Sequence, residues 1–336
     1  MNFSRRNFIL KTSMAEAGIP VAARLNLQAG NSVFYRDHEN LITEPSGQDA
    51  FKFSIFSKTL QWLNYSEMAK VVADLGFDGI DLTVRADGHV LPERVEEDLP
   101  KAVEAAKMAG INIYSIVTFI NNADDPITEK ILKTASSLGI SHYRMDWLYY
   151  NEDKTIEENL ISIESLMRKL AMLNEKYKIR GEYQNHSGRF KPEPYFGSSI
   201  WDLHAVLKNI NSPWLGSQYD IMHAMVEGAY SWDMGFKILN PFVYSLAMKD
   251  FIWKKNRDKW APEVVPLGEG MVNFSRYFDL LKQYQIKCPV SIHYEYSLGG
   301  AELGKHEIPL NKNEVIEAIG KDLATVKRMF KEANLI

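Results

Sequence analysis

The chain has 336 residues, of which 46% are hydrophobic and 24% are charged, and this composition is ordinary for a soluble globular protein. The net charge of −4 gives no sign of a basic face, so nucleic acid is not an expected partner. A single cysteine, Cys288, excludes an internal disulfide and a cysteine-rich metal site.

The N-terminal segment resembles an export signal. Arg5 and Arg6 are adjacent and are followed by apolar residues, as in twin-arginine signals. We therefore expect residues 1–29 to be a signal, with cleavage after Ala29, and residues 30–50 to be an N-terminal extension. The expected location is periplasmic or secreted; without export it would be cytoplasmic. No later run approaches the length needed to span a membrane, so no membrane span is expected.

From residue 51 onward, β-rich runs alternate with amphipathic helical runs. The expected strands are 51–57, 79–85, 111–120, 142–148, 179–186, 214–223, 242–251 and 289–296. The expected helices are 65–76, 98–110, 126–139, 155–177, 199–210, 231–240, 274–285 and 312–334. Such alternation indicates a parallel sheet, and eight repeats favour one closed (β/α)₈ TIM barrel over residues 51–336. No G-x-G-x-x-G motif follows the first strand, which weakens a dinucleotide-binding interpretation.

Polar residues gather at the ends of the expected strands, where barrels of this type place their function. They are Arg85, His89, Thr118, Arg144, Asp146, Glu182, Gln184, Asn185, His186, Gln218, Asp220, His223, Lys249, Asp250, His293 and Glu295. Charged groups are seldom buried unless they are paired or bound to a metal, so their convergence on one ring predicts a site. Each also has a structural interpretation: Arg144 with Asp146 as a salt bridge, and Lys249 with Asp250 as a solvated loop pair.

Two carboxylates form the sharpest subset. Glu182 and Glu295 lie three strands apart and could face each other across a substrate. Such a pair can remove a proton from a carbon next to a carbonyl and return it elsewhere. A divalent cation (Mn²⁺, Mg²⁺ or Zn²⁺) between them would stabilise the enediolate, with Asp220 as a third oxygen ligand.

Several short motifs at these positions resemble the sugar phosphate isomerase/epimerase family, the xylose isomerase-like barrels. They are "GFDGIDLTVR", "YQNHSG", "YDIMH", "KDF", "VPLGEGMVNF" and "HYEY", and the resemblance covers about residues 51 to 332. It implies a metal held by Glu182, Asp220 and Glu295, with His223 contacting the substrate.

The chain departs from the family pattern at two places. The family commonly reads H-x-K-D after strand seven, but this chain reads "AMKD", so Ala247 stands where a ligand histidine would be. Strand five is ambiguous in register. Either Glu182 points toward the site, or Asn185 and His186 do.

The predicted function is a metal-assisted isomerase or epimerase acting on a sugar or keto-sugar. Glu182 and Glu295 are the expected catalytic pair. The expected substrate contacts are Asn185, His186, His223, Lys249, Arg144 and His293. A lyase or hydratase acting on 3-keto-sugars, and a non-catalytic sugar-binding barrel, are the alternatives. No P-loop and no arginine cluster in the sequence points to phosphate, and self-association is left open.

Overall fold

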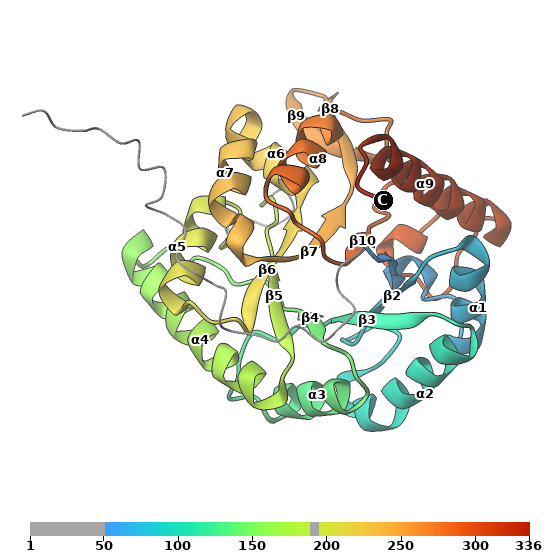
Figure 1. Ribbon diagram of the computed structural model, residues 1–336, viewed down its shortest axis with the longest axis horizontal. Coiled ribbons are helices and arrows are strands. Elements are labelled where there is room, and N and C mark those ends of the chain that lie inside the picture. Colours follow the sequence, from blue (N-terminus) through green and yellow to red (C-terminus); the bar gives the residue numbers. More distant parts are fainter. Residues whose placement is uncertain (1–50, 189–194) are drawn as a thin grey trace, which may run out of the picture. The chain divides into compact units, whose positions relative to one another are not determined.

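The computed structural model describes residues 51–188 and 195–336. Eight parallel strands pair in the order β1-β10-β7-β6-β5-β4-β3-β2 and close into a barrel (Figure 1). They are β1 (Phe53–Phe56), β2 (Gly79–Thr83), β3 (Asn112–Val117), β4 (His142–Arg144), β5 (Arg180–Gln184), β6 (Leu215–Asp220), β7 (Val243–Met248) and β10 (Val290–Ile292). The predicted (β/α)₈ fold is confirmed. The expected signal, 1–29, and the extension, 30–50, lie outside the described residues.

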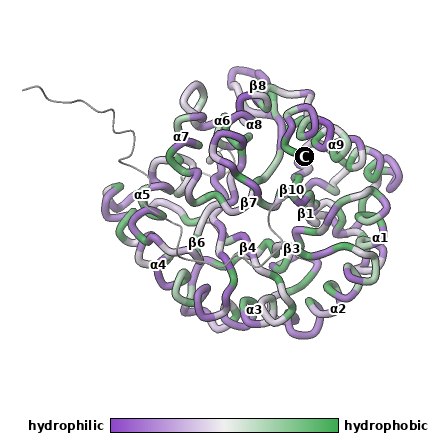
Figure 2. The backbone as a smooth tube through the Cα atoms, viewed as in Figure 1, coloured by the Kyte–Doolittle hydropathy of each residue, from purple (hydrophilic) through white to green (hydrophobic). Residues whose placement is uncertain are grey.

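Helices cover the outside of the barrel (Figure 1). They are α1 (Tyr65–Leu75), α2 (Val95–Met108), α3 (Pro126–Ser137), α4 (Ile156–Tyr177), α5 (Ile200–Ile210), α6 (Ile221–Gly228), α7 (Trp232–Leu239), α8 (Phe274–Gln283) and α9 (Lys312–Glu332). Short 3₁₀ turns are η1 (Ser57–Leu60), η2 (Pro92–Arg94), η3 (Ala229–Ser231), η4 (Asn240–Phe242) and η5 (Ala301–Leu303). Hydrophobic and hydrophilic residues alternate along the outer helices, as expected where one side faces the strands (Figure 2). No helix in the described part of the chain is long and apolar enough to cross a membrane.

Local sequence signals set where several helices begin. Asn64 caps α1 and Glu67 returns a bond to the Asn64 backbone, which completes a capping box. Thr155 and Glu158 do the same for α4. One expected boundary is wrong: α2 begins at Val95 rather than at residue 98, because the preceding 3₁₀ turn η2 leads directly into it.

The sixth barrel strand is shorter than the sequence predicts. It ends at Asp220, whose carboxylate accepts a hydrogen bond from the backbone N–H of His223 at 3.1 Å and so caps α6. The chain turns into a helix here because the cap satisfies a free N–H at the helix start. His223 therefore lies in the first turn of α6 rather than on the expected strand 214–223.

An antiparallel hairpin, which the sequence reading missed, follows the seventh barrel strand. Strands β8 (Asp250–Asn256) and β9 (Lys259–Val265) pair with each other and not with the barrel. Most of their residues are exposed, so the segment lacks the buried apolar pattern of a barrel strand. Its turn places Arg257 at a φ of 54°, in the left-handed region.

Candidate functional site

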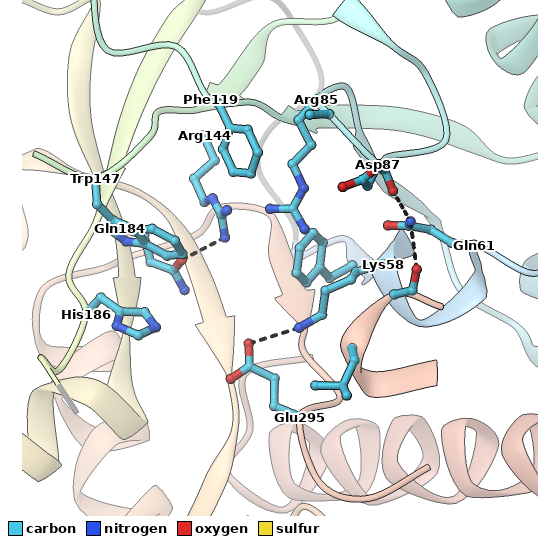
Figure 3. A pocket seen from close by; sticks show the side chains of 14 residues that line it. Lys58, Gln61, Arg85, Asp87, Phe119, Arg144, Trp147, Gln184, His186 and Glu295 are labelled. Carbon is cyan, nitrogen blue, oxygen red and sulfur yellow. Dashed lines mark hydrogen bonds and ion pairs between the residues drawn. The ribbon is translucent and has the colours of Figure 1, made fainter. Parts of the chain in front are cut away.

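A cavity of about 360 Å³ opens at the C-terminal ends of the barrel strands (Figure 3). Its lining residues come from β1, β4 and β5 and from the segments that follow β1, β2, β3, β4, β5 and β10. They are Phe56, Lys58, Gln61, Arg85, Ala86, Asp87, Phe119, Arg144, Trp147, Gln184, His186, Glu295, Leu303 and Gly304. Five of the sequence-predicted strand-end residues are therefore brought together here: Arg144, His186, Glu295, Arg85 and Gln184.

Glu295 and Lys58 form a charged pair at the edge of this cavity. Their Oε1 and Nζ atoms lie 3.7 Å apart, and both side chains remain partly accessible, at 19% and 17%. Burial alone would raise the pKa of Glu295, but the ammonium groups of Lys249 and Lys58 hold it well below its usual range. Burial lowers the pKa of Lys58, and Glu295 only partly opposes that shift. The pair thus places an ionised carboxylate beside an ammonium group whose pKa burial has lowered.

Lys249 lies at the centre of a buried cluster behind Glu295. Its Nζ is 2.9 Å from Asp220 Oδ2, 2.7 Å from His223 Nε2 and 3.4 Å from Glu295 Oε2. Since an ammonium only donates, His223 Nε2 accepts, and the proton of the neutral ring sits on Nδ1, 2.9 Å from Ser187 Oγ. Lys249 is therefore buried, and the alternative in which Lys249 and Asp250 form a solvated loop pair is wrong.

The residues expected to hold a divalent metal do not fit one. Lys249 brings a positive charge to within hydrogen-bond distance of Asp220, so a second cation at these oxygens would be repelled. Ala247, beside Asp220 in the β6–β7 register, offers no donor atom. Across the described residues, no group of three His, Cys, Asp or Glu side chains is arranged to hold a metal ion.

The strand-five register places both Glu182 and Gln184 inside the barrel, at different depths. Gln184 reaches the cavity, where its Nε2 donates to Asp220 Oδ2 at 2.8 Å and its Oε1 accepts from Arg144 Nη1 at 2.9 Å. Asn185 instead exchanges hydrogen bonds with the Asp220 backbone, at 2.8 and 3.0 Å. It fixes β5 against β6 rather than facing the cavity.

His186 lines the cavity as a neutral imidazole. Burial lowers its pKa to about 3. Its Nδ1 lies 2.8 Å from the carbonyl oxygen of Ser187, which only accepts, so Nδ1 carries the proton and Nε2 is left as an acceptor. The rings of His186 and His223 are 3.7 Å apart.

Glu182 does not join Glu295. It lies deeper in the barrel, where Ser245 on β7 donates to its Oε2 and where His142 Nε2 is 3.8 Å from its Oε1. Burial raises the pKa of Glu182 to about 8. No contact in the described chain links the two carboxylates. Inward residues of a barrel fall in successive layers, and Glu182 lies one layer deeper than Gln184, which reaches the cavity. The expected pair of Glu182 and Glu295 is thus not assembled.

His293 is buried beneath the cavity rather than lining it. Its ring lies 4.6 Å from that of Phe56, and neither ring nitrogen has a hydrogen-bond partner within the described chain. Burial lowers its pKa well below the usual range, so the ring is neutral.

The "KDF" and "VPLGEGMVNF" motifs turn out to bind each other. The Asp250 carboxylate accepts four backbone N–H groups, from Phe251, Gly268, Gly270 and Val272, at 2.8 to 3.0 Å. A Cβ on Gly270 would come within 2.1 Å of Asp250 Oδ1, so only glycine allows this approach. The distinctive motif therefore closes the loop that follows the hairpin and does not contact the cavity.

Sequence reasoning missed the cavity residues that follow β1, Lys58 and Gln61. Lys58 follows β1 by two residues, in the same phase as Phe56, and this position was the available signal. Gln61 was also missed; its amide donates to the carbonyl oxygen of Gly304, at 3.0 Å, and to that of Asp87. This amide joins the η1 turn to the loops after β2 and β10.

Comparison with known proteins agrees with the barrel fold. The family model described as xylose isomerase-like TIM barrel matches residues 69–318. Similar solved structures include D-allulose 3-epimerase from Methylomonas sp. in complex with D-allulose (16% identity, TM-score 0.60, 83% of this chain and 97% of that chain). Others are 3-keto-D-glucoside 4-epimerase from E. coli (12%, 0.59, 83% and 99%) and the IOLI protein with a binding zinc atom (18%, 0.64, 83% and 98%). A search of curated proteins finds no match. The chain belongs to the xylose isomerase-like TIM barrel family.

Proposed function

We propose that this chain is an isomerase or epimerase that removes a proton next to the carbonyl of a sugar or keto-sugar bound in the cavity. The observation that carries the proposal is the Glu295–Lys58 pair, an ionised carboxylate 3.7 Å from an ammonium at the mouth of a barrel. Two similar structures are sugar epimerases by name, which supports the same class.

The proposed step uses only side chains of the cavity. The Glu295 carboxylate takes the proton from carbon, and the electron pair moves onto the carbonyl oxygen to give an enediolate. Lys58 donates a hydrogen bond or its proton to that oxygen. As the ammonium turns from Glu295 to the substrate, one of the two cations that depress the carboxylate pKa is withdrawn, which makes Glu295 a stronger base.

The acceptor Nε2 of His186 gives the site a second group for proton transfer. It enters from the end of β5, whereas Glu295 follows β10, three strands away in the barrel order. If Glu295 returns its proton to the neighbouring carbon while His186 Nε2 accepts the hydroxyl proton of that carbon, the product is an isomer. If a proton taken from solvent by His186 Nε2 is delivered to the opposite face of the original carbon, the product is an epimer.

Solvent deuterium exchange into a panel of keto-sugars tests the proposal. Wild-type protein is expected to exchange the hydrogen next to the carbonyl, and Glu295→Gln and Lys58→Met to lower that rate by about 10²- to 10⁴-fold. The matched control is Glu263→Gln, an exposed carboxylate on the β8–β9 hairpin, which should exchange at the wild-type rate. Sugar binding without exchange in the wild type would instead identify a non-catalytic sugar-binding barrel.

Because Lys249 fills the expected ligand set, the proposed chemistry includes no metal step. Elemental analysis is expected to find no stoichiometric divalent ion, and exchange should be unchanged after dialysis against a chelator. Activity that disappears in chelator and returns with Mn²⁺ would contradict this part of the proposal.

A further inference from the structure

Three cationic side chains surround one aromatic ring in the wall of the cavity. Lys58 Nζ and the guanidinium carbons of Arg85 and Arg144 lie 5.5, 5.5 and 5.4 Å from the centre of the Phe56 ring. They come from three different parts of the chain: the η1 turn, the loop after β2, and β4. Figure 3 shows both guanidinium groups directed into the same space. The arginine cluster that the sequence did not reveal is thus made by the fold.

The carboxylates of Asp81, Asp146 and Glu295 act on both arginines through space, but few counter-charges contact the three cations directly. Glu295 pairs with Lys58 at 3.7 Å. Arg144 donates to the neutral amide of Gln184, and its buried Nε has no partner in the described chain. For Arg85 the structure records ring contacts but no hydrogen bond or ion pair to any described residue. The other carboxylate of the lining, Asp87, is exposed.

The guanidinium groups are held by aromatic rings, and this leaves their donors available. Arg85 lies 5.0 Å from the Phe119 ring centre, and Arg144 lies 5.0 Å from that of Trp147, in addition to their shared contact with Phe56. An aromatic ring satisfies the charge of a guanidinium but not its N–H groups, which point outward in the plane of the fork. Two such forks, neither hydrogen-bonded to a carboxylate in the described chain, would be stabilised by an anion bound between them.

Mutual repulsion is consistent with this arrangement. Burial, and next the charge of Arg144, lower the pKa of Arg85 to about 10. A bound oxyanion would relieve both effects, since it supplies opposite charge and accepts the free N–H groups.

We propose that Arg85 and Arg144 form a subsite for an oxyanion carried by the substrate, so that the enzyme acts on an acidic sugar, either a carboxylate or a phosphate ester, rather than on a neutral one. This rests on the proposed function, because the subsite lies in the same cavity as the Glu295–Lys58 pair. The bound oxyanion fixes the sugar by one end, and the carbonyl end is then presented to Glu295.

Calorimetric titration of the full chain tests the subsite, with D-glucose, D-glucuronate and D-glucose 6-phosphate as matched neutral, carboxylate and phosphate probes. Wild-type protein is expected to bind at least one acidic probe tenfold or more tightly than D-glucose, and the tighter of the two identifies the anion. Arg85→Gln should abolish that preference. Equal affinity for all three probes, or binding of none, would overturn the proposal.

Two further variants separate recognition from folding. Arg144→Lys keeps the buried charge but removes the fork, so it should retain the wild-type circular dichroism spectrum and reduce the preference for the acidic probe. Arg328→Gln removes an exposed arginine from α9 and should leave the preference intact. A preference that survives Arg85→Gln and Arg144→Lys alike would refute the subsite.

The outcomes for the subsite and for the proposed function are distinguishable. Deuterium exchange without any preference for an acidic probe would overturn the subsite alone. Tight binding of an acidic probe, lost in Arg85→Gln, with no exchange into any acidic or neutral keto-sugar, would overturn the proposed function alone.

Discussion

Lys249 shows how one side chain sets the charge of its surroundings. Its ammonium contacts two carboxylates, Asp220 and Glu295, and is itself fully buried. A buried charge is tolerated only when its partners remain, because removing one partner leaves the others desolvated and uncompensated. The charge balance of the buried cluster behind the cavity therefore depends on Lys249 alone.

Replacing Lys249 should therefore be strongly destabilising. We expect Lys249→Met to lower the free energy of unfolding by about 3–5 kcal/mol, as measured by urea denaturation. Lys254→Met is the control, because its ammonium forms an exposed pair with Glu263 and should change stability by less than about 1 kcal/mol. Similar losses in the two variants would contradict the role given to the buried ammonium.

Glu182 makes stability depend on pH. Its pKa is about 8 in the folded protein, above the value of an unfolded chain, so the folded state binds the extra proton between roughly pH 4.5 and 8. The sign follows: stability attributable to this group is present at low pH and is lost as pH rises through that window. Glu182→Gln, which cannot ionise, should thus gain stability relative to wild type at pH 8, by on the order of a few kcal/mol, and the difference should shrink toward pH 5.

The measurement is thermal and urea unfolding of both proteins at pH 5 and pH 8. Glu104→Gln, an exposed carboxylate on α2, serves as the matched control. A stability difference that is the same at both pH values would show that Glu182 does not titrate within the window.

Among the elements, the hairpin and the loop behind it are held by the Asp250 carboxylate. Its four backbone hydrogen bonds join the start of β8 to the loop that precedes α8. Hydrogen bonds from backbone N–H groups to an ionised carboxylate are strong and directional. The loop is therefore ordered by a side chain rather than by a strand pairing.

Asp250→Asn should loosen this loop. The amide NH₂ cannot accept, so it would face the N–H groups of Gly268 and Gly270, and we expect a loss of about 2–4 kcal/mol in the free energy of unfolding. Asp279→Asn, at an exposed position of α8, should be close to neutral. Hydrogen exchange of the loop amides provides a local readout, and unchanged protection would contradict the assignment.

For the whole molecule, net charge and site charge have opposite signs. The chain carries a net charge of −4, yet the cavity lining holds three cations and two carboxylates. A small negative net charge disfavours the binding of polyanions, while a local cluster of cations can still bind one small anion. Averages over the composition thus say nothing about the charge that a bound molecule meets.

The N-terminal segment makes a prediction for the intact chain. If residues 1–29 act as a twin-arginine signal, full-length protein expressed in a bacterium with that export pathway should be recovered from the periplasm, with Gly30 as its new N-terminus. Lys in place of both Arg5 and Arg6 should retain the protein in the cytoplasm. Equal periplasmic recovery of the two forms would argue against the signal.

The fold was predictable because the alternation of strand and helix patterns is strong and local. The site was only partly predictable. Strand-end position selected Arg144, His186 and Glu295, but depth inside the barrel, which separates Glu182 from Gln184, depends on the stagger of neighbouring strands. Lys58 was missed because a lysine after a first strand carries no pattern of its own. Its role appears only when β10 brings Glu295 beside it.

The side chain of Gln61 has a consequence for how this enzyme could change its substrate. One amide holds the η1 turn to the loops after β2 and β10, and Lys58, Arg85, Asp87, Leu303 and Gly304 line the cavity on those same segments. Because a loop of different length would pull its carbonyl out of reach of the amide, exchange of either loop would leave a Gln61 N–H group without a partner. New specificity on this side of the barrel would have to arise by coordinated replacement, whereas the wall formed by Trp147 and His186 lies outside that constraint.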